Sequence, residues 1–573
     1  MLLLLAAALF PAAYAQFVAP PTDLTSTKGY LDIPVRYKKV PNGVCETDPN
    51  VKSFSGYVDV EENEHIFFWF FEARNEEPEK APLTVWINGG PGSSSMIGLF
   101  QENGPCGIDS NGKVYNNPYS WSNASNMLYI DQPTQTGFSY SIPVPGYVDS
   151  DTGDIITLPN NTCPDYAKDS SCGTYSYPNV TLTANSTDAA APNFYRALQG
   201  FMGAFPQYSR EKFHFTTESY GGHYGPVFNE YIEKQNKNLA PGAKEIKLES
   251  VMIGNGWYDP IIQYQAYYNF TVYPGNTYDY LPYNASITSL LYNNLYGPGN
   301  CLDQLLDCAA HPAINEICNT ADTFCANHVE SIYDNYLGRD EYDFRELVPD
   351  PFPYSFYIDY LNTPSIQTAI GAYVNFTESN NAVYLAFSST GDDGRRSNTT
   401  QDVASLLAQN ISVVMYAGDA DYNCNWLGGE AVAISVDAPG FQEAGYTNIS
   451  TSDGIVHGQV RQAGKFAFVR VYESGHEVPF YQPELALEMF RRVISGRDVA
   501  TGKHSVVLSE GYRTVGEEKS TYREGNGTVQ WKVLSPDTTY NTTLNGPNAT
   551  PVASSGSKKK MQKRRFKPVA GGV

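Results

Sequence analysis

The sequence predicts an α/β fold whose central sheet is mostly parallel. Six short runs of apolar or β-branched residues recur along the chain, and several of them end abruptly at Gly, Asn or Asp. Buried parallel strands have this pattern because both of their faces are covered. Segments with apolar spacing near 3.6 lie between some of the runs, as expected of helices that cover such a sheet. The predicted strands are residues 83–87, 127–130, 213–216, 251–253, 413–416 and 467–471, and the clearest helices are residues 189–205 and 483–494.

The composition supports a packed, acidic protein. The 573 residues are 42% hydrophobic and 13% aromatic, which excludes a largely disordered chain. Subtracting 38 Lys and Arg from 61 Asp and Glu leaves a formal net charge of -23. Seven basic residues crowd into positions 558–567, so the rest of the chain is more acidic still. Such a body repels nucleic acid, and we expect no nucleic-acid partner.

The N-terminus has the features of a secretory signal peptide. Residues 1–15 form an apolar run that ends in small residues, and we expect cleavage after Ala15. No other stretch reaches the roughly 18 uninterrupted apolar residues that a membrane span requires. Asn-x-Ser/Thr sites for N-linked glycans agree with a secreted or vacuolar destination. There are thirteen such sites, at Asn123, Asn160, Asn179, Asn185, Asn269, Asn284, Asn375, Asn398, Asn410, Asn448, Asn526, Asn541 and Asn548.

The order of the elements divides the mature chain into one main domain and an extension. Residues 56–60 and 65–71 predict an antiparallel pair of strands ahead of the parallel ones. The roughly 150 residues between Trp257 and about Asn410 are too long for a simple crossover, so we predict an inserted cap at about 258–410. Residues 503–573 are poor in aliphatic side chains and end in a basic cluster. We therefore expect a domain at 16–502 and a largely irregular extension at 503–573.

The nine cysteines suggest disulfides with one thiol left over. Four of them in the predicted cap are spaced 7, 10 and 7 apart, which allows either nested or crossed pairing, and Cys163 with Cys172 closes a short loop. Zinc is the competing interpretation, but no C-x-x-C pair occurs and an oxidising compartment favours disulfides. We expect no metal. The four cap cysteines are Cys301, Cys308, Cys318 and Cys325, and the three others are Cys45, Cys106 and Cys424.

Three residues in chain order predict nucleophilic catalysis. Ser219 follows a predicted strand in the sequence TESYGG, a variant of the G-x-S-x-G nucleophile elbow in which Thr217 replaces the first Gly. A serine hydroxyl needs a base and an orienting carboxylate, and α/β-hydrolases supply them in the order Ser, Asp, His. Asp421 and His476 each follow a later predicted strand. Asp419 is a rival for the carboxylate, but the spacing G-x-x-D counted from Gly418 favours Asp421.

Four segments together closely resemble the serine carboxypeptidase family, over roughly residues 29–496. This resemblance implies an α/β-hydrolase fold with an inserted, disulfide-stapled cap, and a nested cysteine ladder in that cap. The chain departs from the family at Thr217 and at Ser93, where a Cys often follows the glycines. The four segments are WINGGPGSSS, TESYGGHYGP, YAGDADYNCNWLGG and ESGHEVPFYQPE.

The resemblance also implies roles for individual residues. Ser219 would be the nucleophile, His476 the general base and acid, and Asp421 its orienting carboxylate. The backbone N–H groups of Gly90 and Tyr220 would form the oxyanion hole. The substrate's terminal carboxylate would meet Asn88, Glu102 and Glu218, with Trp86 and Gly89 beside them. Cys424 would be a free thiol near the substrate. Cys45 would then pair with Cys106. The pocket for the leaving residue would be walled by Gln101 and Glu477.

We therefore expect a serine carboxypeptidase that acts on peptide or protein C-termini through an acyl-enzyme, without a cofactor, and most actively at acidic pH. Two alternatives stay open. Plant acyltransferases share the resemblance and pass the acyl group to an alcohol, and release of free amino acid from a peptide alone would separate the two activities. A noncatalytic secreted glycoprotein would be expected to lack a member of the triad, and all three are present.

Overall fold

The structure is a computed structural model that describes residues 17–548 apart from 168–170, 210–211, 273–275, 396–397, 453 and 508–510. The predicted signal peptide and the basic cluster at the C-terminus lie outside the described residues.

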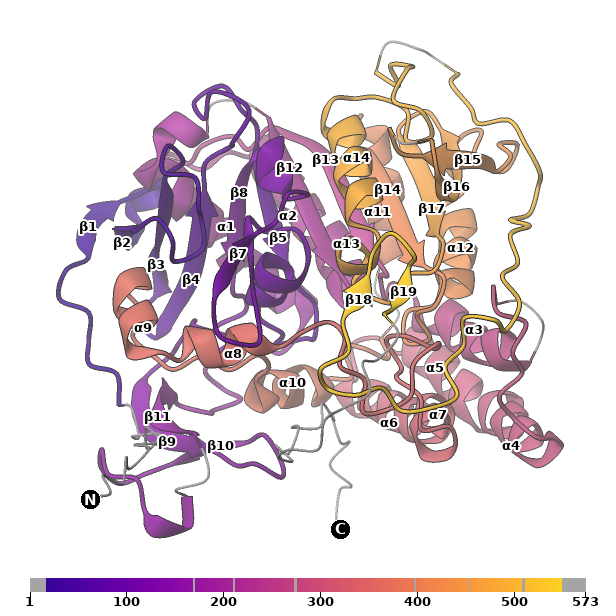
Figure 1. The fold of residues 1–573 in the computed structure, drawn as a ribbon, viewed down its shortest axis with the longest axis horizontal. Coiled ribbons are helices and arrows are strands. Elements are labelled where there is room, and N and C mark those ends of the chain that lie inside the picture. Colours follow the sequence, from indigo (N-terminus) through magenta and orange to yellow (C-terminus); the bar gives the residue numbers. More distant parts are fainter. Residues whose placement is uncertain are drawn as a thin grey trace, which may run out of the picture.

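A twelve-stranded mixed sheet runs through the molecule (Figure 1). Its six middle strands are parallel, in the order β8, β5, β12, β13, β14, β17, and its margins are antiparallel. This confirms the predicted fold class and every predicted strand. The strands in sheet order are β1 Thr25–Lys28, β2 Pro34–Val40, β3 Ser53–Glu61, β4 Glu64–Phe71, β8 Asn126–Ile130, β5 Leu83–Ile87, β12 Phe213–Glu218, β13 Leu248–Gly254, β14 Ser412–Gly418, β17 Phe466–Val471, β16 Val456–Ala463 and β15 Thr447–Ser450.

Alternate residues of the strands enter two different hydrophobic cores because successive side chains of a strand point to opposite faces. In β5, Val85 packs in the core that contains α1 (Thr187–Ala204) and α2 (Gly221–Lys237), whereas Trp86 packs in the core that contains α14 (Pro483–Ile494). Both cores are built from fully buried aliphatic and aromatic residues. The sheet is therefore covered on both faces, and the loops at the carboxyl ends of its parallel strands meet at one edge.

The segment between β13 and β14 is an insertion made mostly of helices. Disulfides Cys301–Cys325 and Cys308–Cys318 join α5 to α6, so the pairing is nested rather than crossed. Farther along, α8 and α9 lie beside the first strands (Figure 1), where the Tyr57 hydroxyl accepts a hydrogen bond from the Tyr373 amide at 2.9 Å. The helices are α3 Pro260–Val272, α4 Ala285–Tyr296, α5 Cys301–Ala310, α6 Asn315–Cys325, α7 Ile332–Tyr336, α8 Phe356–Leu361, α9 Pro364–Ile370, α10 Asn381–Ser388 and α11 Thr399–Ala408.

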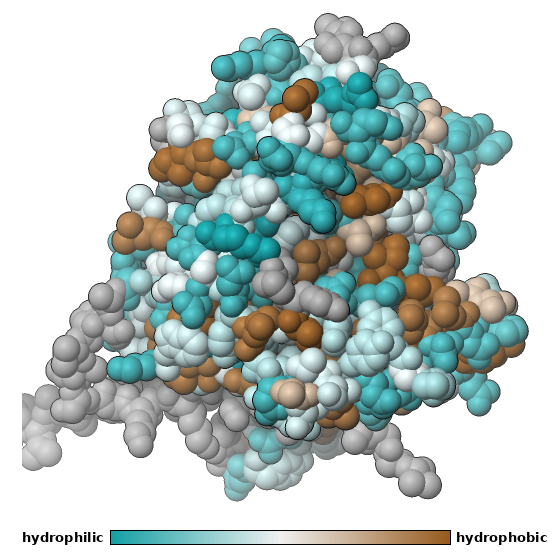
Figure 2. All heavy atoms as spheres, turned by 90° about the vertical axis from the view of Figure 1, so that its right-hand side faces the viewer, coloured by the Kyte–Doolittle hydropathy of each residue, from teal (hydrophilic) through white to brown (hydrophobic). Residues whose placement is uncertain are grey.

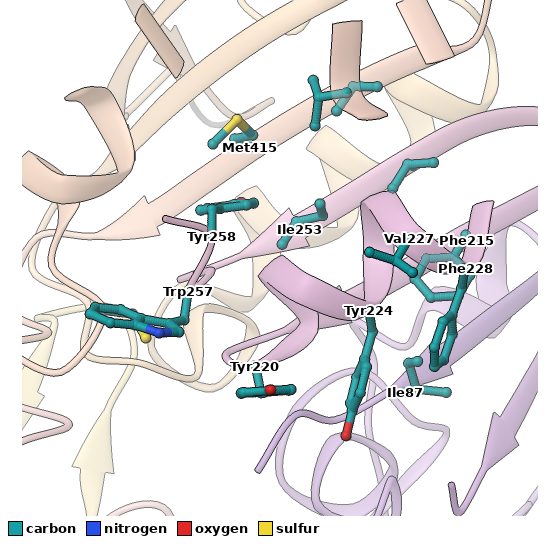
Figure 3. Packing of buried hydrophobic residues seen from close by; sticks show 14 of the residues in the cluster. Ile87, Phe215, Tyr220, Tyr224, Val227, Phe228, Ile253, Trp257, Tyr258 and Met415 are labelled. Carbon is teal, nitrogen blue, oxygen red and sulfur yellow. The ribbon is translucent and has the colours of Figure 1, made fainter. Parts of the chain in front are cut away.

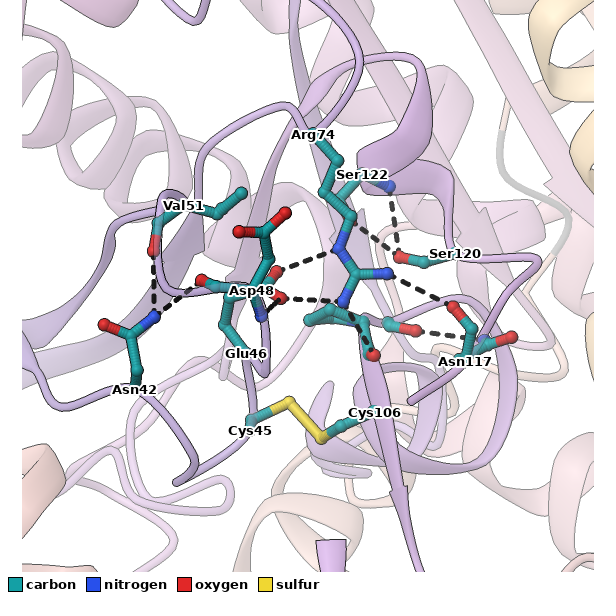
Figure 4. A network of polar contacts seen from close by, with 12 residues as sticks. Asn42, Cys45, Glu46, Asp48, Val51, Arg74, Cys106, Asn117, Ser120 and Ser122 are labelled. Carbon is teal, nitrogen blue, oxygen red and sulfur yellow. Dashed lines mark hydrogen bonds and ion pairs between the residues drawn. A yellow bond between two sulfur atoms is a disulfide. The ribbon is translucent and has the colours of Figure 1, made fainter. Parts of the chain in front are cut away.

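The disulfide Cys45–Cys106 ties the loop before β3 to the strand β6 (Cys106–Ile108). Figure 4 shows that Arg74 lies beside this disulfide. Its guanidinium donates two hydrogen bonds to the carboxylate of Glu46, at 2.8 and 3.0 Å. A buried pair with a two-point contact of this kind holds the two loops in one arrangement. The fourth disulfide joins Cys163 to Cys172, and Cys424 is free and buried.

Several elements were not predicted from the sequence. The antiparallel margins β1, β2, β15 and β16 escaped prediction, as did a separate three-stranded sheet in the order β10, β9, β11. The strands of this small sheet are β9 Pro143–Val148, β10 Ile155–Thr157 and β11 Ser171–Ser176. Strands β1 and β10 are mostly exposed and β9 is mostly half-buried, whereas β11 and β16 are buried but contain polar residues or Gly between their apolar ones. None of these strands forms the continuous apolar run that revealed the central strands.

The chain after α14 is irregular but packed on the body. It runs down one side of the molecule and returns to the front, where the two-residue strands β18 (Tyr540–Asn541) and β19 (Gly546–Pro547) lie near α13 (Val478–Tyr481) (Figure 1). The side of the molecule seen in Figure 2 is mostly hydrophilic, with separate hydrophobic patches scattered over it. Within the described residues, no helix has both the length and the apolar character that crossing a membrane requires.

Candidate active site

Ser219 stands on a sharp turn between β12 and α2. Its φ is 63°, in the left-handed region that side chains rarely adopt, and its amide donates to the Gly254 carbonyl at 3.0 Å. The Ser219 carbonyl then accepts the Gly222 and Trp257 amides, both at 2.9 Å. Strained backbone of this kind persists only where the surroundings hold it in place, and it is the feature that a nucleophile elbow requires.

Thr217 fits the turn although the elbow pattern has Gly at this position. Its hydroxyl donates to the Ile87 carbonyl at 2.7 Å. A Cβ on Gly221 would lie only 2.0 Å from the Thr217 oxygen. The small residue that the turn needs is thus supplied by Gly221, and Thr217 fills the space in front of it.

His476 and Asp421 form a buried pair. Nδ1 of His476 lies 2.8 Å from Oδ2 of Asp421. The same oxygen accepts the side-chain amide of Asn255 at 2.7 Å and the backbone amide of Cys424 at 3.1 Å. Because a carboxylate can only accept here, Nδ1 carries the proton and Nε2 is left with a free electron pair. This is the tautomer that a general base needs.

Asp419, the rival carboxylate, has a different environment. It accepts a hydrogen bond from Tyr278 at 3.1 Å and from the Glu473 amide at 2.8 Å, and it pairs with Arg470 at 3.3 Å. None of these contacts involves His476, whereas Asp421 bonds to it directly, so the geometry favours Asp421 as the orienting carboxylate.

The charges around His476 favour its protonated form. Burial acts against the imidazolium, but the charge and hydrogen bond of Asp421 outweigh it, and Glu477 and Glu102 add to the effect. The pKa of His476 is therefore raised above its ordinary value. A raised pKa strengthens the imidazole as a proton acceptor and confines its neutral form to higher pH.

Two loops meet beside Ser219. A Cβ on Gly89 would lie 2.3 Å from the Tyr220 nitrogen and 2.9 Å from the Ser219 Cβ, so only Gly allows this approach. Gly90 follows with a φ of 110°, which likewise demands Gly. The two amides predicted to form the oxyanion hole, those of Gly90 and Tyr220, thus belong to loops in direct contact.

A chain of hydrogen bonds leads from the sheet core to Glu218. The Trp86 indole donates to Oδ1 of Asn88 at 2.7 Å, and the Gly98 amide donates to the same oxygen at 3.0 Å. With its oxygen occupied, Asn88 directs its Nδ2 at Oε1 of Glu218, at 3.0 Å. The chain orients an amide and a carboxyl group immediately before the candidate nucleophile.

Three acidic residues lie at this chain of hydrogen bonds or beside it, and all three are buried: Glu102, Glu218 and Glu477. Burial, and then the charge of Glu477, raise the pKa of Glu102 to about 8. Burial, followed by the charges of Glu102 and Glu477, raises the pKa of Glu218 well above its ordinary value. Like charges in one dry site cannot all ionise, so Glu102 and Glu218 retain protons that isolated carboxyl groups would lose.

Gln101 and Cys424 complete the predicted set. The Gln101 amide donates to the Tyr354 carbonyl at 3.0 Å, which fixes this side chain against the inserted segment. Burial, together with the charge of Asp421, raises the pKa of the Cys424 thiol well above its ordinary value. One ligand-type atom each of Asp421, Cys424 and His476 lies within 4.8 Å of the others, but a metal needs the thiolate, and the site favours the thiol. We assign no metal to this group.

Residues 41–496 match the serine carboxypeptidase family. The chain belongs to this family. Among curated relatives, carboxypeptidase S1 homolog A of Arthroderma otae is 40% identical over 548 residues, covering 88% of this chain and 83% of the relative. Carboxypeptidase S1 of Penicillium janthinellum is 38% identical over 468 residues, covering 80% of this chain and 99% of the relative.

A solved carboxypeptidase structure has a similar fold. Kex1Δp, a prohormone-processing carboxypeptidase from Saccharomyces cerevisiae, has a TM-score of 0.63 at 23% identity, covering 80% of this chain and 95% of its own. The family match and the relatives confirm the expected class of enzyme, a serine-type carboxypeptidase that hydrolyses peptides.

The structure brings residues to this carboxypeptidase site that the sequence did not reveal. Asn255 follows β13 and donates to Asp421. Tyr342, in the inserted segment, packs its ring 4.9 Å from the His476 ring, and its carbonyl accepts the His476 amide at 2.8 Å. Asn255 could have been suspected because it follows a parallel strand, as Ser219 and Asp421 do, whereas nothing in the local sequence marks Tyr342.

Proposed function

We propose that this enzyme releases single amino acids from peptide C-termini through an acyl-enzyme on Ser219. The observation that carries the proposal is the 2.8 Å bond between His476 and Asp421, at the same sheet edge as the strained turn of Ser219. The family membership supports the class of reaction.

In the proposed reaction, Ser219 Oγ attacks the carbonyl carbon of the last peptide bond while Nε2 of His476 takes its proton. The Gly90 and Tyr220 amides stabilise the negative oxygen that forms. The C–N bond then breaks, and His476 returns the proton to the leaving amine. Water next attacks the ester, again with His476 as base, and frees the shortened peptide and Ser219.

Recognition of a free C-terminus is assigned to Asn88, Glu102 and Glu218. A protonated carboxyl group and the Asn88 amide can both donate hydrogen bonds to the substrate carboxylate. The raised pKa values of the two acids keep such a proton available, and they support activity at acidic pH. Gln101 and Glu477 are assigned to the pocket of the leaving residue, where Glu477 would favour Lys or Arg.

We further propose that residues 1–15 are a signal peptide, that 16–502 form the catalytic domain with its cap at about 258–410, and that 503–573 are an extension. Secretion or vacuolar delivery agrees with the four disulfides and with the Asn-x-Ser/Thr sites for N-linked glycans. Asn375 is an exception among the glycan sites, since it is buried and its oxygen accepts the Thr174 amide at 2.9 Å. Peptide mapping should find glycans at exposed sites such as Asn284 and none at Asn375.

A fluorophosphonate label tests the nucleophile directly. Mass spectrometry should find the label on Ser219, and Ser219→Ala should lose about three or more orders of magnitude in kcat while keeping the fold, as triad knockouts do. Label on another serine would refute the assignment. Amino-acid analysis of a peptide digest tests the exopeptidase step, because residues should appear one at a time from the C-terminus.

A further inference from the structure

One segment of the insertion contacts both loops of the proposed oxyanion hole. This segment, residues 378–392, consists of α10 and the residues that flank it. At its start, the Asn380 amide donates to the Gly92 carbonyl at 3.1 Å, and the Glu378 carbonyl accepts the Ser94 amide at 2.9 Å. These contacts fix the glycine loop that carries the Gly90 donor.

At this end of the segment, the glycine loop packs closely against the first turn of α10. A Cβ on Gly92 would lie 2.9 Å from the Cβ of Val383 in the first turn of α10, and Gly92 has a φ of 91°. The side-chain amide of Asn380 also donates to the Gln135 carbonyl at 2.7 Å. The glycine loop is therefore pressed directly against the start of α10.

At the other end of the segment, Asp392 contacts the second donor residue. The Tyr220 hydroxyl donates to Oδ2 of Asp392 at 2.6 Å. The same oxygen accepts the backbone amide and the hydroxyl of Thr187, at 2.9 and 2.7 Å, at the start of α1. Both partners are buried, Tyr220 to 3% exposure and Asp392 to 7%.

The position of the Tyr220 side chain can affect the oxyanion hole because the backbone amide of the same residue is one of the two proposed donors. Figure 3 shows Tyr220 projecting from the start of α2, on the side away from Ile253 and Met415. The Phe387 ring of α10 packs edge-on to the Tyr220 ring at 6.0 Å. The side chain is thus held by a hydrogen bond and by ring packing, both from the same segment.

We propose that Asp392 is a positioning residue, which sets the oxyanion hole by anchoring the Tyr220 hydroxyl to the segment that also anchors the glycine loop. This inference rests on the proposed function, in which the Gly90 and Tyr220 amides hold the oxyanion. One rigid segment then determines the spacing of the two donors. Asp392 itself touches neither the substrate nor the reacting atoms.

The expected effect is on the transition state rather than on substrate binding. Losing an oxyanion-hole donor costs roughly 100- to 1,000-fold in kcat, so displacing a donor should cost less, about 10-fold. Tyr220→Phe removes the hydroxyl and keeps the ring, and Asp392→Ala removes the acceptor. Each should lower kcat about 10-fold with KM nearly unchanged. The double variant should lose no more than either single variant, because all three lack the same bond.

A transition-state analogue separates this role from a general structural one. A peptide aldehyde forms an oxyanion-like adduct on the serine, so its Ki should rise in step with the fall in kcat/KM. Binding of the peptide product, which forms no adduct, should not change. The matched control is Tyr208→Phe, which breaks an equally short 2.6 Å bond between a buried Tyr and the buried Glu72 outside the site. Tyr208→Phe should change the stability of the fold but neither kcat nor the Ki of the aldehyde.

The outcomes distinguish the inference from the function on which it rests. If Ser219 takes the fluorophosphonate label but Tyr220→Phe and Asp392→Ala keep wild-type kcat and aldehyde affinity, the positioning role is wrong and the proposed function stands. Losses that add in the double variant, or that Tyr208→Phe reproduces, would also overturn the positioning role. Failure of Ser219 to take the label would overturn the proposed function itself.

Discussion

The side-chain amide of Asn88 donates to Oε1 of Glu218 at 3.0 Å, one residue before the proposed nucleophile. Asn88 cannot turn its oxygen toward Glu218, because that oxygen already accepts the Trp86 indole and the Gly98 amide. Its Nδ2 therefore always presents donors, and the protonation of Glu218 and Glu102 decides whether further donors are available. We therefore expect the binding of a substrate carboxylate to depend on pH.

We predict that kcat/KM for a peptide with a free C-terminus falls as the pH rises toward about 8, the pKa of Glu102. Once both acids are ionised, they repel the substrate carboxylate. The matching C-terminal amide lacks that charge, so its hydrolysis should depend mainly on neutral His476 and should persist at higher pH. Rates for both substrates, measured across pH 4 to 9 as about the accessible range, provide the test.

Glu218→Gln serves as the partner variant because it keeps the shape and removes one titrating group. The profiles of the acid and the amide should then differ less than in the wild type. Parallel profiles in the wild-type enzyme would contradict the role of protonated Glu102 and Glu218 in binding the substrate carboxylate, whatever the variant did.

A second prediction concerns the two aspartates after β14. Asp421→Asn should lower kcat by about three to four orders of magnitude, because an amide can donate to His476 and so favour the wrong tautomer. Asp419→Asn should leave most activity in the folded enzyme, yet lower stability by a few kcal/mol, since it leaves Arg470 buried without its charge partner. Single-turnover rates and urea unfolding of both variants measure the two effects. The reverse pattern would make Asp419 the orienting carboxylate.

The third prediction concerns the leaving residue. Glu477 is buried beside His476, and a carboxylate in a dry pocket attracts a cationic side chain more strongly than in water. Glu477→Gln should therefore lower the ratio of kcat/KM for C-terminal Lys to that for C-terminal Leu by about 10-fold. Glu477→Met should lower it at least as much. An unchanged ratio in both variants would show that Glu477 does not face the leaving residue.

The sequence predicted those parts of the site that carry a local signal. Ser219, Asp421 and His476 each follow a buried parallel strand within a few residues, and such strands are visible as apolar runs. The structure adds groups that depend on contacts between distant segments. Asp392 reaches Tyr220 across 172 positions, and Asn255 reaches Asp421 across 166. An Asp after a helix and an Asn after a strand are ordinary turn residues, so only the folded chain distinguishes them.

The strands of the sheet differ in the same way. The middle of the sheet was predictable because its strands are buried on both faces, as in β5, where all five residues are buried. The marginal strand β1 has four exposed residues and gives no apolar signal. Margins of this kind form because the neighbouring strand offers hydrogen bonds, which no local pattern reports.

The last prediction is that the inserted segment becomes less stable as the pH rises. Asp322, Glu330 and Asp393 lie in this segment, within range of one another's charges and with no basic partner among the groups that shift them. Burial, and then the charge of Asp393, raise the pKa of Glu330 to about 8. Burial, and then the charge of Asp392, raise the pKa of Asp393 to about 7. The pKa of Asp322 is also raised well above its ordinary value, again chiefly by burial.

Because these folded-state pKa values exceed the values of about 4 in an unfolded chain, the folded enzyme holds more protons than the unfolded chain between about pH 4 and 8. The stabilisation is complete below pH 4 and is lost as the pH rises through 7 to 8. Asp322→Asn and Glu330→Gln each remove one such proton, so near pH 6 the free energy of unfolding should fall less steeply with pH, by up to about 1.4 kcal/mol per unit. Glu316→Gln, at an exposed position on the same helix as Asp322, should leave the slope unchanged. Pulse proteolysis in urea at several pH values measures the slope, and equal slopes in all four proteins would rule out this carboxyl cluster as the cause.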